Sequence, residues 1–485
     1  MNEYEDCKMR NSKLDGVKGL LRALGGVIEV AILSAAYYCI WKLMYADLAF
    51  IDYHSAVVYL LFGVYALLAS VIFNNFDGFK FGYLRMTEVF ASQVIALLIL
   101  NMITYFQLCL MANQMVSVLP MLALMLADAV IAFVSIFILS ALYHRIYPPK
   151  NMVMILGNDN AVDLKFKMDT RSDKYRITKM ISVDEGLESI CKQLFDYDAV
   201  IINDVGAEIR NDLVKFCYHN QIRCYATPKM SDLIVRGATD ICLFDTPLLL
   251  IRSRGLNPAQ RVIKRLMDIV LCLIAMVLAA PIMLIVAALI KLEDGGPVFY
   301  KQERVTMGGK IFKILKFRSM IVNAEKDGKS QPAVDNDPRI TKIGKLIRAT
   351  RIDELPQILN ILKGDMSIVG PRPERLEHME SFSREIPEFD FRLKVKGGLT
   401  GYAQVYGKYN TSPYDKLRLD MMYIENYSIL LDIKLILMTI RIIFKKESTQ
   451  GFNERDSMEQ MKAEMLHHIH KDMEVQFEET TTGGR

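Results

Sequence analysis

The sequence predicts a membrane protein built from a four-helix transmembrane bundle, a small doubly wound α/β domain, and a mostly α catalytic domain with a re-entrant membrane helix and interfacial helices. Three observations predict this: long apolar runs near the N-terminus, short apolar strands alternating with helical patterns, and a later apolar run broken by proline. The predicted segments are 1–147, 148–253, 254–450 with the re-entrant helix at about 266–291, and a polar tail at 451–485.

Four apolar runs in the first segment have the length of transmembrane helices, about 20 residues for a ~30 Å bilayer core. They are Leu20–Leu43, Ala56–Phe73, Glu88–Met111 and Leu119–Leu142. Between Val89 and Tyr143 the only charged residue is Asp128. A carboxylate inside a span marks either a polar pathway or a hydrogen bond between helices.

The loops predict the orientation of this bundle, because Lys and Arg are enriched on the cytoplasmic side. One set of loops carries basic residues: Lys13, Lys18, Arg22, Lys80, Arg85, Arg145 and Lys150. The alternate loops carry Asp47 and Asp52 or no charge, with Lys42 as the exception. We therefore expect both ends of the bundle to face the cytoplasm. No cleavage pattern precedes the first span, so we expect it to be retained.

Composition narrows the possible partners. The chain has a net charge of +4 and 24% charged residues, so we expect no nucleic-acid partner. Eight cysteines lie without a C-x-x-C pair, which predicts reduced thiols and neither a disulfide framework nor a zinc site.

The middle segment has the pattern of alternating strands and helices that is typical of a parallel sheet. The predicted strands are Met152–Leu156, Tyr175–Ile181, Ala199–Asn203 and Arg223–Thr227, and Ala207–His219 is a predicted helix. Gly157 follows the first strand, but no G-x-G-x-x-G fingerprint does. We expect a Rossmann-like domain without a dinucleotide, in a structural or regulatory role, and a homodimer formed through residues 145–250.

The apolar run Ile269–Ile290 is long enough to cross a membrane, but Pro281 interrupts it. Both flanks are basic, so a crossing would place one of them outside, against the positive-inside rule. A half-helix of about 12 residues spans only ~18 Å. These features favour a hairpin that enters and leaves by the cytoplasmic face, and the alternative is a kinked fifth span.

Two later segments have the pattern of interfacial helices. Ile340, Ile343 and Ile347 share one helix face opposite lysines and arginines, and Ile433–Phe444 is apolar but interrupted by charges. The first of these leads directly to Asp353 and Glu354, which would place both carboxylates near the lipid surface.

Asp353 and Glu354 lie in the sequence Arg351-Ile-Asp-Glu-Leu-Pro-Gln357, shortly before Gly370-Pro-Arg-Pro-Glu374. Pro356 suits the first turn of a helix, which predicts Asp353 as its N-cap. A carboxylate at a helix end beside arginines suits phosphate chemistry, as a nucleophile with a clamp. The alternative is an ordinary capped helix with surface ion pairs.

Residues 255–450 resemble the bacterial sugar transferases, the monotopic phosphoglycosyl transferases that act on polyprenyl phosphate. The resemblance rests on motifs in order: Lys264–Asp268, Gly296–Arg304, Phe312–Met320, Arg351–Gln357, Gly364–Glu374 and Lys396–Val405. The four spans and the α/β domain resemble the large subclass. One departure is Ala280-Pro281, where members often carry Ser-Pro.

The resemblance implies transfer of hexose-1-phosphate from a UDP-sugar to undecaprenyl phosphate at the bacterial inner membrane. Asp353 would be the nucleophile that forms a covalent phospho-sugar intermediate and expels UMP. Asp353 and Glu354 would bind Mg²⁺, or Glu354 would assist the acceptor. The implied substrate-binding residues are Lys316, Arg318, Arg351, Arg372, Glu374 and Gln404. The implied structural residues are Pro281, Pro356, Pro371 and Pro373.

Two other functions are compatible with parts of the sequence. A membrane-tethered nucleotide-sugar oxidoreductase would use the middle domain, but it requires a glycine-rich loop after Leu156. A membrane assembly scaffold would leave the Asp353–Glu354 pair without a role. The sequence does not show which sugar is transferred.

Overall fold

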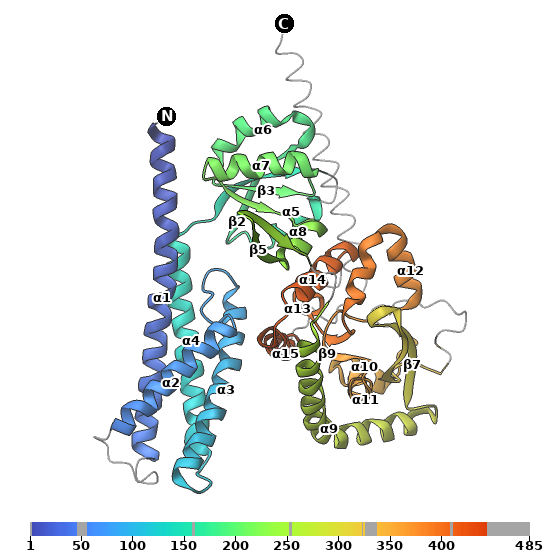
Figure 1. The fold of residues 1–485 in the computed structure, drawn as a ribbon. Coiled ribbons are helices and arrows are strands. Elements are labelled where there is room, and N and C mark those ends of the chain that lie inside the picture. Colours follow the sequence, from blue (N-terminus) through green and yellow to red (C-terminus); the bar gives the residue numbers. More distant parts are fainter. Residues whose placement is uncertain are drawn as a thin grey trace. The chain divides into compact units, whose positions relative to one another are not determined.

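The computed structural model describes residues 2–45, 56–157, 161–251, 255–322, 324, 337–407 and 411–443. The chain divides into two compact units, Met1–Thr227 and Pro228–Arg485, shown along the colour gradient of Figure 1. The predicted tail at 451–485 lies outside the described residues.

The first unit begins with four long helices, which confirm the four predicted spans. They are α1 (Asn2–Met44), α2 (Ala56–Asn75), α3 (Met86–Ala112) and α4 (Leu119–Ile146). All four are long and apolar enough to cross a membrane. Aromatic side chains fill the bundle core, where the rings of Tyr37 and Tyr65 stack with centroids 4.5 Å apart. Leu110 and Leu126 point outward, as lipid-facing residues do.

Polar side chains inside the bundle link helices to one another. Asn101 Nδ2 donates to Asp128 Oδ2 at 2.9 Å, so Asp128 forms the hydrogen bond between helices that was one of its two expected roles. Gln93 Nε2 donates to Glu29 Oε2 at 3.0 Å. Both carboxylates are buried and join helices in an apolar environment, where hydrogen bonding avoids the cost of an unpaired polar group.

The α/β domain is a parallel sheet in the order β2-β1-β3-β4. Its strands are β1 (Lys150–Leu156), β2 (Tyr175–Ser182), β3 (Ala199–Asn203) and β4 (Arg223–Ala226), and its helices are α5 (Ala161–Asp169), α6 (Leu187–Gln193) and α7 (Ala207–His219). The four predicted strands and the predicted helix are confirmed. Every residue of β3 is buried, which explains the apolar run of its first four residues.

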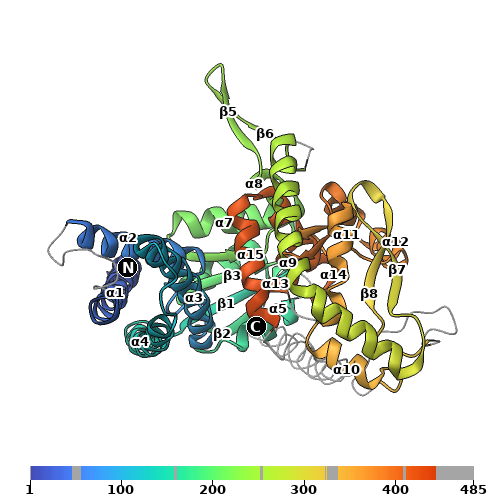
Figure 2. The same cartoon turned by 90° about the horizontal axis from the view of Figure 1, so that it is seen from below.

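The second unit begins earlier than the expected boundary at residue 254. Helix α8 (Met230–Arg236) places Met230 and Leu233 in a core with Leu417 and Met421, and this packing assigns the segment to the second unit. Strands β5 (Thr239–Leu243) and β6 (Thr246–Leu250) follow as an antiparallel hairpin, which projects away from α8 and α9 in Figure 2.

Helix α9 runs from Pro258 to Asp294 and contains the expected proline, Pro281. Asn257 and Gln260 form a capping box at its start. Figure 1 shows α9 bending sharply between its two halves. A proline inside a helix removes one backbone hydrogen bond and clashes with the preceding turn, so Pro281 is the physical cause of the bend.

The remainder of the second unit is mostly helical, as expected. Its elements are the antiparallel pair β7 (Phe299–Val305) and β8 (Ile311–Phe317), the parallel pair β9 (Ser367–Val369) and β10 (Gly398–Thr400), and helices α10 (Lys342–Ala349), α11 (Gln357–Lys363), α12 (Leu376–Glu385), α13 (Tyr402–Tyr406), α14 (Pro413–Glu425) and α15 (Ile429–Ile443). In α10, Ile343 and Ile347 pack against Val286 and Ile290 of α9. That part of the expected lipid-facing stripe is therefore covered by protein.

Candidate active site

The segment that carries the paired carboxylates is a short 3-10 turn, Ile352–Glu354. Arg351 precedes it in the left-handed region at φ 55°, and Pro356 is the N-cap residue of α11. The prediction that Asp353 caps the helix is therefore wrong, and Pro356 lies just before the first turn instead of inside it. The 3-10 turn comes before the first residue of α11, so Asp353 lies on the N-terminal side of that helix and outside it.

Glu354 is held by two cations from distant segments. Lys316 Nζ on β8 donates to Glu354 Oε1 at 2.7 Å, and Arg372 Nη2 donates to the same oxygen at 2.8 Å. Burial by itself would raise the pKa of Glu354, but the charges of Arg372 and Lys316 outweigh it and hold the pKa well below the usual range. Glu354 is therefore a fixed, ionised partner.

Asp353 is the opposite case. Within the described residues, no hydrogen bond or ion pair of its carboxylate is found, and the side chain is half-buried. Burial raises the pKa of Asp353 above its usual value, against the lowering effect of Lys316. Arg348 and Arg351 also lower it. An unengaged carboxylate of raised basicity beside cations has the properties of a nucleophile for a phosphorus centre.

The loop that carries Arg372 is tied down along its length. Gly370 N donates to Thr400 O and Gly398 N donates to Pro371 O, both at 2.8 Å. A Cβ on Gly398 would lie 2.1 Å from Gly370 N, so only glycine permits this approach. Pro371 and Pro373 flank Arg372 and restrict its backbone further, as expected.

Two residues that the sequence did not single out support this loop. Arg392 Nη2 donates to the carbonyl oxygen of Arg372 at 2.9 Å, and it pairs with Asp420 Oδ2 at 2.8 Å. Both side chains are buried. Nothing in the local sequence pointed to them, because they lie far from Arg372 in the chain and meet it only in the fold.

Glu374 belongs to the same ionic cluster, because Arg392 Nη1 lies 3.5 Å from its Oε1. Burial opposes ionisation, but His378, Arg392 and other cations lower the pKa of Glu374 to about 2. Arg304, a motif residue that was not among the expected ligands, lies nearby, and burial with the repulsion of Arg372 lowers its pKa to about 10. The cluster is crowded with positive charge, as an anion site requires.

Other expected substrate ligands have different partners. Arg318 pairs with Asp294 at the end of α9, so its guanidinium already has a carboxylate partner. Gln404 Nε2 contacts Gly370 O at 3.5 Å, which makes it a support of the loop. Arg348, which was not among the expected ligands, lowers the pKa of Asp353 through its positive charge.

The chemistry of Asp353 and Glu354 is that of the oxygen ligands that Mg²⁺ prefers. Among the described residues no group of three or more His, Cys, Asp or Glu side chains gathers at one point. Mg²⁺ characteristically uses one or two carboxylates and completes its shell with phosphate oxygens and water. Asp353 and Glu354 could supply those carboxylates.

Comparison with known proteins places this site in a family. The family model described as bacterial sugar transferase matches residues 259–446. One relative is the UDP-N-acetylgalactosamine-undecaprenyl-phosphate N-acetylgalactosaminephosphotransferase of Aeromonas hydrophila. It is 48% identical over 190 residues, which make up 39% of this chain and 45% of that protein. A UDP-glucose:undecaprenyl-phosphate glucose-1-phosphate transferase of Escherichia coli is 41% identical over 211 residues, 42% and 44% of the two chains.

A shorter relative is covered almost completely. The uncharacterized sugar transferase EpsL of Bacillus subtilis is 38% identical over 192 residues, which are 40% of this chain and 92% of EpsL. The chain spans about half the length of the relatives named first. The fold and the candidate site define a membrane protein with a buried ionic cluster, and the chain belongs to the bacterial sugar transferase family.

Proposed function

We propose that this protein transfers hexose-1-phosphate from a UDP-sugar to undecaprenyl phosphate, giving undecaprenyl-diphospho-sugar and UMP. The observation that carries the proposal is the unengaged Asp353 carboxylate beside a Glu354 that Lys316 and Arg372 hold. The names of the relatives support the substrate classes. The product would begin exopolysaccharide, capsule or O-antigen synthesis.

The reaction proceeds in two displacements at one phosphorus atom. An oxygen of the Asp353 carboxylate attacks the β-phosphorus of the UDP-sugar, and the bond from that phosphorus to the bridging oxygen breaks. UMP leaves with the electron pair of that bond. A phosphate oxygen of undecaprenyl phosphate then attacks the same phosphorus and releases Asp353. Two steps let a soluble donor and a lipid acceptor use the site in turn.

The surrounding residues supply positive charge and position. Lys316 and Arg372 place their charges beside Asp353, where they stabilise charge that develops on the phosphoryl oxygens. Glu354 keeps both cations in place, and Arg392 with Asp420 holds the Arg372 loop. Mg²⁺, when bound by Asp353 and Glu354, would offset the charge of the diphosphate. Arg351, next to the 3-10 turn of Asp353, binds a phosphate group of the substrate in this proposal.

The same proposal includes the arrangement at the bacterial inner membrane. Helix α9 enters and leaves by the cytoplasmic face, with the bend at Pro281 inside the bilayer, and the catalytic residues face the cytoplasm. Cysteines placed at the exposed positions Val262 and Leu292, in a background without native cysteines, should both react with an impermeant maleimide from the cytoplasmic side only. Labelling from opposite sides would establish a fifth span instead.

A homodimer is part of the proposal as well. The β5–β6 hairpin lies within the region expected to mediate it and exposes apolar side chains, including Phe244 at 98% exposure. A second copy would cover them. The mass of the protein in lipid nanodiscs, compared with a Phe244→Ser variant, tests this, and a monomer at working concentration would refute it.

The first test is UMP release from UDP-N-acetylgalactosamine, UDP-glucose and UDP-galactose with undecaprenyl phosphate and Mg²⁺. The wild type should release UMP with one donor, and Asp353→Asn should lower the rate by at least about 10³-fold. The exposed Asp390 provides the control, since Asp390→Asn should keep the wild-type rate.

A trapping experiment examines the intermediate directly. Without acceptor, the wild type should release about one UMP per active site and retain the sugar phosphate on Asp353. Release by Asp353→Asn at the wild-type rate would remove Asp353 from the nucleophile role. No release with any donor would contradict the proposed reaction itself.

A further inference from the structure

A separate cavity lies in the first unit, where the helical bundle meets the α/β domain. It has a volume of about 190 Å³. The α2–α3 loop, the end of α4 and the starts of β1 and β2 contribute to its wall, together with α1 and β4.

The wall of this cavity is strongly basic and aromatic. Five cationic side chains line it, namely Lys18, Arg22, Lys150, Lys174 and Arg223, against one carboxylate, Asp173. Five tyrosines complete much of the remaining wall. Basic pockets of this kind at the end of a transmembrane bundle suit phosphate groups.

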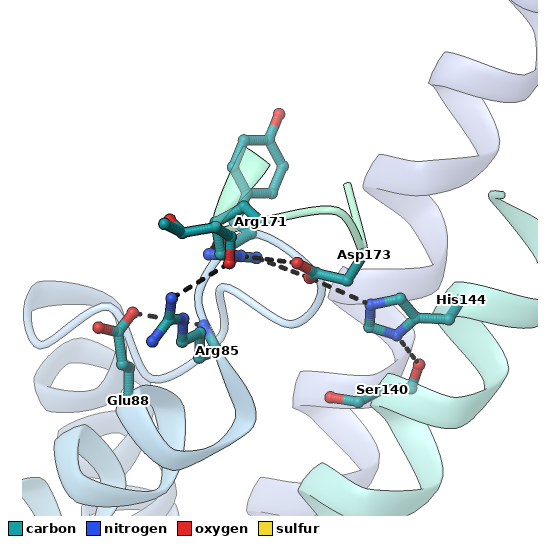
Figure 3. Close-up of polar contacts among 8 residues, drawn as sticks. Arg85, Glu88, Ser140, His144, Arg171 and Asp173 are labelled. Carbon is teal, nitrogen blue, oxygen red and sulfur yellow. Dashed lines mark hydrogen bonds and ion pairs between the residues drawn. The ribbon is translucent and has the colours of Figure 1, made fainter. Parts of the chain in front are cut away.

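The single carboxylate is already committed to other cations. Arg171 Nε and Nη2 donate to the two oxygens of Asp173 at 2.9 and 3.0 Å, and His144 Nε2 lies 3.6 Å away (Figure 3). Burial opposes ionisation of Asp173, but the pKa is lowered chiefly by its hydrogen bonds with Arg171. Asp173 therefore divides its charge between Arg171, His144 and the cavity, and it is the one carboxylate that faces the five cations of the cavity lining.

Tyrosine rings hold several of these cations in place. Tyr83 is contacted by Lys174 Nζ at 4.0 Å from the ring centroid and by the Arg22 guanidinium at 4.8 Å. Neither cation forms an ion pair with a carboxylate among the described residues. Burial is the main cause that lowers the pKa of Lys174, and the nearby charges of Arg171 and Arg22 lower it as well, while Tyr83 and Asp173 raise it. A bound anion would relieve this repulsion.

From this geometry we propose that the cavity binds a phosphate or diphosphate group, with Arg22 and Lys174 as its central ligands. The group can reach it from two sources. It is carried either by a membrane lipid, since tyrosines at the end of a bundle mark the membrane–water boundary, or by a soluble phosphate compound. The site is separate from Asp353 and does not depend on the transfer reaction.

Hydrogen exchange of the full chain in phosphatidylcholine nanodiscs locates the binding. The soluble arm titrates inorganic diphosphate, and the lipid arm adds phosphatidic acid to the nanodisc. We expect saturable protection of the segments around Tyr83, Lys150, Lys174 and Arg223 in at least one arm. The arm that gives it identifies the source.

Variants then test the assigned ligands. Lys174→Gln and Arg22→Gln should each weaken the protection about tenfold, the usual loss for one charge-assisted contact. Lys174→Arg should retain it. The exposed Lys215 on α7 is the control, and Lys215→Gln should bind as the wild type does.

The same data separate binding from folding, because a misfolded variant would also exchange faster in the buried strands β1 and β3. If Lys174→Gln did so, Arg22→Gln would decide the question. No protection of these segments in either arm would overturn the proposal. Equal protection in Lys174→Gln, Arg22→Gln and the wild type would do the same.

Discussion

The α/β domain of the first unit and the candidate catalytic cluster of the second differ in the regularity of their secondary structure and in how much charge they bury. The parallel sheet buries β1 and β3 with apolar side chains, and its fold is typical of nucleotide-binding proteins. The candidate catalytic cluster consists of short turns and strands of three residues, yet it buries or half-buries Glu354, Glu374, Arg392 and Asp420. In this chain the regular α/β domain lacks the glycine-rich ligand loop that is common in such folds, and the irregular region carries the ionic cluster.

Burying charge costs free energy unless partners compensate, so a cluster of this kind persists where chemistry needs it. The α/β domain has no glycine fingerprint after β1, which argues against the oxidoreductase reading. The comparison predicts that changes in the cluster damage catalysis strongly and that changes in the first unit do so weakly.

Arg372→Ala should have the largest effect among the supporting residues. It removes a positive charge beside Asp353 and leaves Glu354 with one cation, so we expect kcat/KM to fall by about 10²–10³-fold. UMP release with a saturating lipid acceptor measures it. Arg384→Ala, an exposed change on α12, is the matched control. A fall in kcat/KM of less than threefold in Arg372→Ala would contradict the expected importance of the ionic cluster for catalysis.

Glu354→Gln should have a smaller effect on rate and a measurable effect on stability. Because the pKa of Glu354 is lowered in the fold, its stabilising effect is present at neutral pH and is lost as pH falls through that lowered pKa. At pH 7 we expect about 1.5–3 kcal/mol less unfolding free energy. Chemical unfolding compared with the exposed Glu380→Gln measures it, and equal stabilities of the two variants would contradict the ion-pair account.

The pH profile should report the raised pKa of Asp353. The nucleophile must be ionised, so kcat/KM should fall as pH drops through a value above that of an ordinary aspartate. Lys316→Gln removes a charge that lowers this pKa and should move the acid limb to higher pH. Lys313 lies on the same strand with an exposed side chain, and Lys313→Gln should leave the limb in place. If the acid limb of Lys316→Gln stayed at the wild-type pH, Lys316 would not influence the ionisation of Asp353.

Removal of the first unit should have the smallest effect on chemistry. A fragment of residues 228–485 contains the second unit and the whole family match at residues 259–446. We expect its kcat to stay within about tenfold of the full chain. The fragment with Asp353→Asn provides the background rate. Loss of activity in a folded fragment would show that the first unit contributes to catalysis.

Much of the fold could be predicted from local patterns. Span length and hydropathy identified α1 to α4, and apolar strand patterns identified β1 to β4 with boundaries close to those observed. The motif around Asp353 and Glu354 identified the candidate site. The cap assignment of Asp353 was wrong, because the 3-10 turn depends on how Arg351 and the following residues pack, which a local propensity does not describe.

By itself the sequence determined the membrane segments, the parallel sheet and the residues that carry charge, because these follow from periodicity and from side-chain chemistry over a few turns. Only the tertiary structure decided which charges meet. It joined Glu354 to Lys316 and Arg372, gave Arg318 to Asp294, and placed Arg392 under the Arg372 loop. Coulomb interaction depends on distance in space, and residues far apart in the chain reach that distance only after the backbone has folded.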